Sequence, residues 1–262
     1  MRVEQLGTGE PEIAIIGGIH GDEPCGVHAV EQLIADAPAV ERPVALVVAN
    51  ERALKAGTRY VDEDLNRAFP GDHDAVTHEG RLAAEISDRF GACTTLSMHS
   101  TQSYHGMFAI VDEVTEYARN VCPRLSVDTL VDAGEHTEGR LFEAIPQTIE
   151  VECGYQQSEQ AATNAALVAR EFLGAVGAVP EFERPAKDGI PVFRLEDQIP
   201  KAKAERYEVY ASNFEPVAAG TAFASADGDD IVADEEFYPI LMSPEGYEQV
   251  FGYAADRIET IP

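Results

Sequence analysis

Apolar residues in the first two thirds of the chain occur either in short continuous runs or at helical spacing. The runs that predict buried strands lie at 12–18, 43–50 and 93–100. The stretches that place apolar side chains on one helical face lie at 23–37, 78–91 and 158–177. Because strand and helix alternate, we predict an α/β fold with a mixed, mostly parallel sheet flanked by helices.

The pattern changes near residue 182, where helical periodicity stops. Pro and Gly then recur, and short strand-like runs such as "ERYEVYAS" and "EFYPILM" replace the long helices. We therefore predict two domains, an α/β domain at 1–182 and a small β-rich domain at 183–262.

The composition limits the kinds of partner. The chain has 19 Lys and Arg residues against 47 Asp and Glu residues, a formal net charge of −28. Such a surface repels nucleic acids and anionic membranes, so neither is an expected partner. The scarcity of Lys, the excess of acids and the absence of Trp resemble proteins of salt-accumulating halophiles. No apolar run is long enough to span a bilayer and no leader is visible, so we expect a cytoplasmic protein.

Two histidines and a glutamate stand where predicted strands end. His20 and Glu23 lie in "IIGGIHGDEPCG", directly after the first strand, and His99 lies at the end of "CTTLSMHS". Ligands of open α/β sheets bind at the carboxyl ends of strands, and catalytic zinc takes three His or carboxylate ligands. The three residues are therefore candidates for one metal site. The spacing also allows a simpler role, in which Glu23 interacts with the N-terminus of the next helix.

Arginines follow in the stretch 49–71, which we expect to be a loop. Arg59, Asn66 and Arg67 could clamp a carboxylate, because guanidinium groups bind carboxylates through paired hydrogen bonds. The alternative is structural, since the acidic residues at 62–64 of the same loop could pair with both arginines.

Five segments of the chain, taken in order, resemble the aspartoacylase and succinylglutamate desuccinylase family of the zinc carboxypeptidase superfamily. They are "GGIHGDEPCG", "GTRYVDEDLNRAF", "MHSTQSYHG", "IEVECG" and "YPILMSPEGYE", and the resemblance runs from about residue 12 to about residue 255. It implies a zinc carboxypeptidase-like fold. It also implies zinc ligands at His20, Glu23 and His99, a transition-state arginine at Arg59, and carboxylate recognition by Asn66 and Arg67.

The same resemblance implies a general base in a Glu-x-Gly segment at a strand end. Glu152 fits this segment because Gly154 follows it, whereas the spacing of "RLFEAIPQTIE" favours Glu150 on the same strand face. We predict Glu152 and leave Glu150 as the alternative. Arg140 is then a candidate substrate residue, and Tyr247 matches a tyrosine that closes the pocket from the small C-terminal domain.

Two positions depart from the family pattern. Members commonly carry Asp two residues before the third ligand, where it can orient the ligand histidine, and this chain has Ser97. Aspartoacylases proper also carry Lys three residues after the closing tyrosine, and this chain has Val250. An aspartate-like substrate is therefore not implied.

From the resemblance we expect a zinc-dependent amidohydrolase with one zinc ion per subunit. It would hydrolyse an N-acyl amino acid or a similar small carboxylate-bearing amide, and the β-rich domain would cover the active site. Two alternatives stay open. A metallocarboxypeptidase would use the same residues in an open groove, and a binding protein for small molecules would keep the fold without the chemistry. A homo-oligomer is compatible with the sequence.

Overall fold

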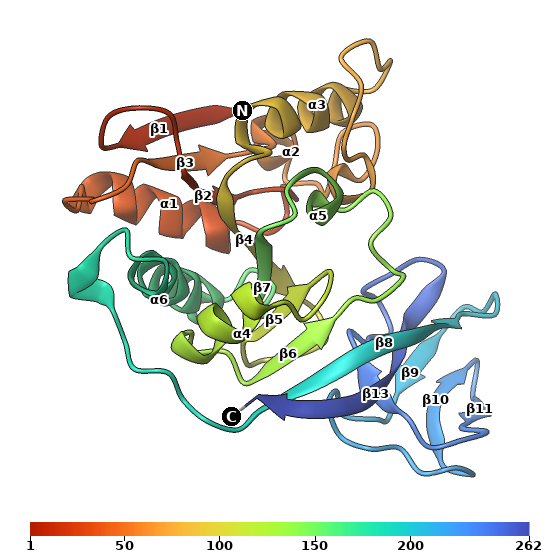
Figure 1. The fold of residues 1–262 in the computed structure, drawn as a ribbon. Coiled ribbons are helices and arrows are strands. Elements are labelled where there is room, and N and C mark those ends of the chain that lie inside the picture. Colours follow the sequence, from red (N-terminus) through yellow and green to blue (C-terminus); the bar gives the residue numbers. More distant parts are fainter. Residues whose placement is uncertain (262) are drawn as a thin grey trace.

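The computed structural model describes residues 1–261 and contains two sheets, shown in Figure 1. The larger sheet has ten strands in the order β1-β3-β2-β4-β7-β5-β6-β8-β13-β12. Its strands are β1 (Arg2–Leu6), β2 (Ile13–Gly17), β3 (Val44–Val48), β4 (Thr94–Thr101), β5 (Phe108–Val111), β6 (Thr129–Asp132), β7 (Thr148–Tyr155), β8 (Ile190–Pro200), β12 (Tyr238–Ile240) and β13 (Val250–Ile261). The smaller sheet consists of β9 (Tyr207–Val209), β10 (Ala222–Ala226) and β11 (Asp229–Val232).

Parallel pairing dominates the centre of the larger sheet. The pairs β2–β3, β2–β4, β4–β7, β5–β6 and β6–β8 are parallel, whereas β1, β5, β12 and β13 make antiparallel pairs. The helices are α1 (Cys25–Asp36), α2 (Glu51–Ala56), α3 (His78–Phe90), α4 (Glu116–Val121), α5 (Leu141–Ala144) and α6 (Glu159–Ala175), with short 3₁₀ turns η1 (Leu65–Arg67), η2 (Cys122–Arg124) and η3 (Pro180–Phe182). The predicted mixed, mostly parallel α/β sheet is confirmed.

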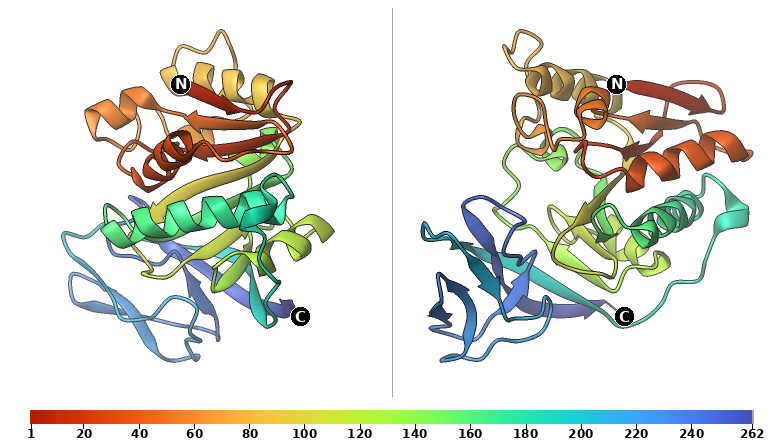
Figure 2. Two further views of the ribbon diagram at one scale, coloured as in Figure 1. Left: turned by 90° about the vertical axis from the view of Figure 1, so that its left-hand side faces the viewer. Right: turned by 180° about the vertical axis from the view of Figure 1, so that it is seen from behind.

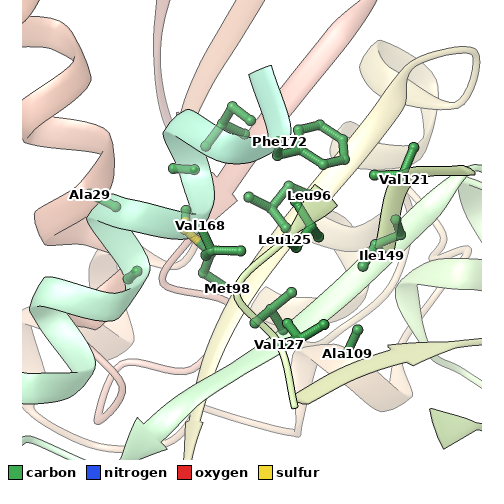
Figure 3. Packing of buried hydrophobic residues seen from close by; sticks show 14 of the residues in the cluster. Ala29, Leu96, Met98, Ala109, Val121, Leu125, Val127, Ile149, Val168 and Phe172 are labelled. Carbon is green, nitrogen blue, oxygen red and sulfur yellow. The ribbon is translucent and has the colours of Figure 1, made fainter. Parts of the chain in front are cut away.

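Helices cover both faces of this sheet because its central strands are apolar on both sides. Along β2, Ile13 and Ile15 belong to the core under α1 and α6, whereas Ala14 and Ile16 belong to the core under α3. Figure 2 shows α1 and α6 side by side on one face. Figure 3 shows Leu96 and Met98 of β4 beside Val168 and Phe172 of α6 in that core.

Close backbone contacts fix the loop that follows β2. A side chain at Gly17 would meet the backbone of Gly26 at 2.3 Å, so only glycine lets α1 start this close to the strand. A side chain at Gly21 would meet the backbone of Ala53 in α2 at 2.1 Å. The loop is therefore held between two helices, which orients the side chains on either side of Gly21.

The stretch 49–71 is more regular than the predicted loop. Asn50 begins α2 by accepting a hydrogen bond from the Ala53 amide, and Gly57 ends it in the left-handed conformation. Asp64 begins η1 in the same way by accepting from the amide of Asn66. Arg59 therefore lies in the connection, whereas Asn66 and Arg67 lie in a 3₁₀ turn.

The last third of the chain is rich in strands, as predicted. β8 and β13 continue the larger sheet, because β8 pairs in parallel with β6, while β9–β11 form a sheet of their own. The division into domains at residue 182 therefore stays a prediction. Within residues 1–261, no helix combines the length and the apolar character that crossing a membrane requires.

Candidate metal centre and its pocket

His20, Glu23 and His99 converge at the carboxyl ends of the central strands. His20 and Glu23 lie in the loop between β2 and α1, and His99 lies in β4, next to β2 in the sheet. All three are buried, and their ligand atoms lie within 4.8 Å of one another. The structure thus brings together the three residues that the sequence proposed as ligands.

The Glu23 carboxylate lies between the two imidazole rings. Its Oε1 is 2.9 Å from Nδ1 of His20, its Oε2 is 3.1 Å from Nδ1 of His99, and the Ser100 amide donates to Oε2 at 3.2 Å. Two ring nitrogens and a carboxylate facing one another in a buried site match the donor set of a catalytic zinc site. The residues present therefore fit a divalent metal.

The second nitrogen of each imidazole also has a partner. His20 Nε2 is 3.0 Å from Oδ1 of Asp64, and His99 Nε2 is 3.0 Å from Oγ of Ser97. Partners of this kind fix the ring orientation of metal-binding histidines. Ser97 thus fills the place of the family's aspartate with a neutral hydroxyl, two residues before His99 on the same strand face.

Glu23 and the two histidines shift one another's pKa values. Burial lowers the pKa of His99, but the hydrogen bond and the charge of Glu23 outweigh it and raise this pKa to about 9. Burial raises the pKa of Glu23, but both histidines act against it and hold that pKa well below its usual value. Because a metal binds imidazoles without their protons, affinity for it should fall in acid.

Arg59 is tied to this group by two ion pairs. Its Nη1 lies 3.1 Å from Oε1 of Glu23, and its Nε lies 3.0 Å from Oδ2 of Asp64. Burial raises the pKa of Asp64, but His20, Arg59 and Arg67 together hold it well below its usual value. Asp64 therefore links Arg59 to His20. From the sequence, Asp64 was expected only as a structural ion-pair partner of the arginines. Its contact with His20 was not predicted, although its place two residues before Asn66 in the segment "GTRYVDEDLNRAF" was a signal.

Glu150 and Glu152 project from the same face of β7 as Ser97 and His99 do from β4. The parallel register places Glu150 beside Ser97 and Glu152 beside His99. Glu150 accepts a hydrogen bond from Nδ2 of Asn66 at 3.1 Å, and its other oxygen is 3.7 Å from Nη1 of Arg140. The two carboxylates therefore have different surroundings.

Glu152 has much less stabilisation for a negative charge. Its Oε2 is buried and has no hydrogen-bond partner among residues 1–261. Burial and the charge of Glu23 raise the pKa of Glu152 to about 7. A carboxyl group with this pKa can accept and release a proton near neutral pH.

One cavity of about 90 Å³ is lined by the three candidate ligands together with Arg59, Glu150 and Glu152. Arg67, Arg140 and Tyr247 also line it, and Tyr247 comes from the turn between β12 and β13. Burial raises the pKa of Tyr247 to about 12, so its phenol stays neutral. The predicted substrate residues thus reach the same space as the predicted ligands.

Asn66 differs from Arg67 in what its side chain can still bind. Its Nδ2 donates to Glu150, and its Oδ1 accepts from the Leu141 amide at 3.0 Å. Arg67 is exposed and donates from Nη1 to the Asn66 carbonyl at 2.6 Å. Direct contact of Asn66 with a substrate carboxylate stays a prediction, and the structure gives Asn66 a role in holding Glu150.

Comparison with known proteins identifies the family of the chain. A family model described as "Succinylglutamate desuccinylase/Aspartoacylase catalytic domain" matches residues 10–173. The chain belongs to this family. The match covers both segments with the candidate metal ligands and the strand with Glu150 and Glu152, so these residues lie within the matched range.

Individual relatives within the family match over shorter stretches. Aspartoacylase from Danio rerio is 32% identical over 120 residues, which cover 40% of this chain and 38% of that protein. N-acyl-aromatic-L-amino acid amidohydrolase (carboxylate-forming) B from Danio rerio is 29% identical over 134 residues, 43% of this chain and 42% of that protein. The matched segments thus span less than half the length of these relatives.

Solved structures share the fold over nearly the whole chain. The product-bound ectoine utilization protein EutE (DoeB) from Ruegeria pomeroyi has a TM-score of 0.79 at 20% identity, covering 99% of this chain and 88% of that one. Murine aminoacylase 3 has a TM-score of 0.74 at 19% identity, covering 97% of this chain and 98% of that one. The C-terminal strands are therefore part of a shared architecture.

Proposed function

We propose that the protein is a zinc-dependent amidohydrolase that cleaves an N-acyl amino acid or a similar small carboxylate-bearing amide into an acid and an amine. The observation that carries the proposal is one cavity lined by His20, Glu23, His99 and Glu152, in which Oε2 of Glu152 has no hydrogen-bond partner among residues 1–261. Membership of the desuccinylase and aspartoacylase family supports it.

Zinc held by His20, Glu23 and His99 would acidify a water molecule and polarise the acyl carbonyl. Glu152 is the general base in this proposal, because its carboxylate can take the proton of the attacking water and later deliver it to the leaving nitrogen. Glu150 is less suited to this role, since its two carboxylate oxygens already have partners in Asn66 and Arg140.

Arg59 and Arg67 have separate tasks in this proposal. Arg59 is held beside Glu23 and would stabilise the negative charge that develops on the acyl oxygen. Arg67 has no ion pair among residues 1–261 and would hold the carboxylate of the substrate.

The lining of the cavity favours a deacylase over a carboxypeptidase. Leu241, Ser243 and Tyr247 of the C-terminal segment line part of it, where they would restrict the entry of a long peptide more than that of a small amide. The complete set of ligands and the free Glu152 favour an enzyme over a binding protein that lost its chemistry.

A substrate screen tests the proposal. Purified protein is assayed for amine release from N-acetyl, N-succinyl and other N-acyl amino acids in high salt, before and after removal of metal with a chelator. We expect release that the chelator abolishes and added zinc restores. Release that is insensitive to the chelator would contradict the metal role, and release of C-terminal residues from long peptides would select the carboxypeptidase.

A further inference from the structure

The three arginines of the cavity differ in how far their charges are already neutralised. Arg59 pairs with Glu23 and Asp64, and Arg140 lies 3.7 Å from Glu150. Arg67 makes no ion pair within the part of the chain that the structure describes. Of these three arginines, Arg67 is therefore the one whose charge is most available to an incoming anion.

The pair of Glu150 and Arg140 is fixed in place by its surroundings. Glu150 is 3% exposed and Arg140 is 4% exposed, so each charge needs the other. Asn66 connects β7 with the start of α5. Its side chain donates to Glu150 in β7 and accepts from the amide of Leu141, the neighbour of Arg140. A substrate carboxylate cannot easily displace Glu150, which is anchored in the central strand β7.

We propose that Glu150 is a specificity-determining residue that makes the enzyme select substrates with a single carboxylate. This specificity proposal rests on the proposed function and narrows the substrate class of the enzyme. The Glu150 carboxylate lies within ion-pair distance of the Arg140 guanidinium that a second carboxylate would need and partly neutralises its charge, and Glu150 itself lines the cavity. An acidic group beside it would be repelled, whereas an uncharged acyl chain or amino-acid side chain would fit.

The test compares N-acetyl-L-glutamine with N-acetyl-L-glutamate, which have nearly the same shape and differ by one negative charge. Wild-type protein loaded with zinc should have a kcat/KM at least about tenfold higher for the glutamine compound. Equal values, or a preference for the glutamate compound, would overturn the specificity proposal while leaving the amidohydrolase intact.

A binding measurement distinguishes failure of the specificity proposal from failure of the proposed amidohydrolase function. The two compounds are titrated calorimetrically into zinc-loaded Glu152→Gln protein, in which turnover is not required. Tighter binding of the glutamine compound supports the role of Glu150 even if neither compound is hydrolysed. Equal binding, tighter binding of the glutamate compound, or no binding of either overturns it.

Two variants test whether Glu150 causes the preference for the glutamine compound. Glu150→Gln should shift the ratio of the two affinities toward the glutamate compound by about tenfold, because Arg140 becomes available. The double variant Glu150→Gln with Arg140→Met loses both charges and serves as the matched control. It should show a smaller shift, and it keeps the test valid if the single variant does not fold. A wild-type ratio in the folded variants overturns the proposal.

Discussion

His20 and His99 each present one ring nitrogen to Glu23 and the other to a polar partner. The partners differ in charge, since His20 contacts the carboxylate of Asp64 and His99 contacts the hydroxyl of Ser97. A carboxylate partner increases the basicity of a ligand histidine more than a hydroxyl does. The hydroxyl of Ser97 should therefore raise the basicity of His99 less than the carboxylate of Asp64 raises that of His20.

Ser97→Ala should lower the affinity for zinc by about tenfold, because loss of such a partner typically costs 10–100-fold in affinity. Zinc affinity is measured by competition with a chelating dye. Thr95→Val is the matched control, since Thr95 lies two residues earlier in β4 and its buried hydroxyl has no hydrogen-bond partner in residues 1–261. Equal affinities of Ser97→Ala and wild type would contradict the assigned role of Ser97.

At the scale of elements, α3 holds the connection that carries Arg59 and Asp64. Glu79, in the first turn of α3, is fully buried and accepts hydrogen bonds from the side-chain Nδ2 of Asn50 and from the backbone N–H groups of Val61, Asp62 and Glu63. Burial raises the pKa of Glu79, but these hydrogen bonds outweigh it and lower the pKa. One carboxylate thus anchors the backbone between the two functional side chains.

Glu79→Gln should lower the free energy of unfolding at neutral pH by about 1–3 kcal/mol, because Gln leaves buried amide groups without acceptors. The folded-state pKa of Glu79 lies below the unfolded value, so its contribution is complete above that value and is lost as the pH falls through the folded-state pKa. The gap between variant and wild type should therefore narrow in acid.

Chemical denaturation of wild type and Glu79→Gln at pH 7 and at successively lower pH values measures the difference in their free energies of unfolding. Glu85→Gln is the control on the same helix, since Glu85 is exposed and its pair with Arg89 should contribute less than about 1 kcal/mol. A gap that stays constant or widens in acid would contradict the role given to the Glu79 carboxylate.

The turn that carries Tyr247 is held by hydrogen bonds from a lysine that directly follows β8. Lys201, directly after β8, donates from Nζ to the carbonyls of Pro244 and Tyr247 at 2.7 and 2.5 Å. Within the turn, the amides of Glu245 and Gly246 donate to the hydroxyl of Ser243. The wall of the cavity therefore depends on one lysine outside it.

Lys201→Met should raise KM by about tenfold and change kcat less. Loss of a charge-assisted hydrogen bond is worth about 1.5 kcal/mol, and the turn lies away from the reacting atoms. Steady-state kinetics on the best substrate of the screen measure both constants. Lys203→Met is the control because Lys203 is exposed two residues later. A fall in kcat alone, or equal effects of the two variants, would argue against this positioning role.

At the scale of the whole molecule, the dominant feature is a net charge of −28. Like charges on one surface repel one another and destabilise the compact state. Salt screens this repulsion, since the Debye length falls from about 10 Å at 0.1 M to about 3 Å at 1 M. The protein should therefore depend on salt for stability, as the composition suggests.

The thermal midpoint should rise by several degrees between 0.1 and 1 M KCl, which corresponds to about 1–2 kcal/mol for a chain of this size. Differential scanning calorimetry over a salt series measures it. Because screening saturates, most of the rise should occur below 1 M. A protein that is most stable in dilute buffer would contradict the charge argument and the proposed halophilic character.

The sequence predicted the centre of the fold because the central strands are buried on both faces and appear as unbroken apolar runs. It placed His20, Glu23 and His99 at strand ends for the same reason. It missed α2, although Asn50 and Gly57 are recognisable start and stop signals. Attachment of β8 and β13 to the larger sheet could not be predicted, because strand pairing over such distances leaves no local pattern.

The choice between Glu150 and Glu152 shows where the sequence becomes insufficient. The two residues share one face of β7, so periodicity treats them alike. They differ in their tertiary contacts, because Asn66 and Arg140 approach Glu150 from remote parts of the chain, whereas Glu23 lies near Glu152. Which carboxylate keeps an unpartnered oxygen is thus a property of tertiary structure.

Zinc content and amine release, measured on the same preparations of wild type and Glu152→Gln, test whether the protein is a zinc enzyme with Glu152 as its base. We expect one zinc ion per chain in both proteins and a kcat at least about 10²-fold lower in the variant, the usual effect of losing a general base. Wild-type protein that binds no zinc would contradict it. A variant with unchanged kcat, with turnover lost instead in Glu150→Gln, would show that the other carboxylate is the base.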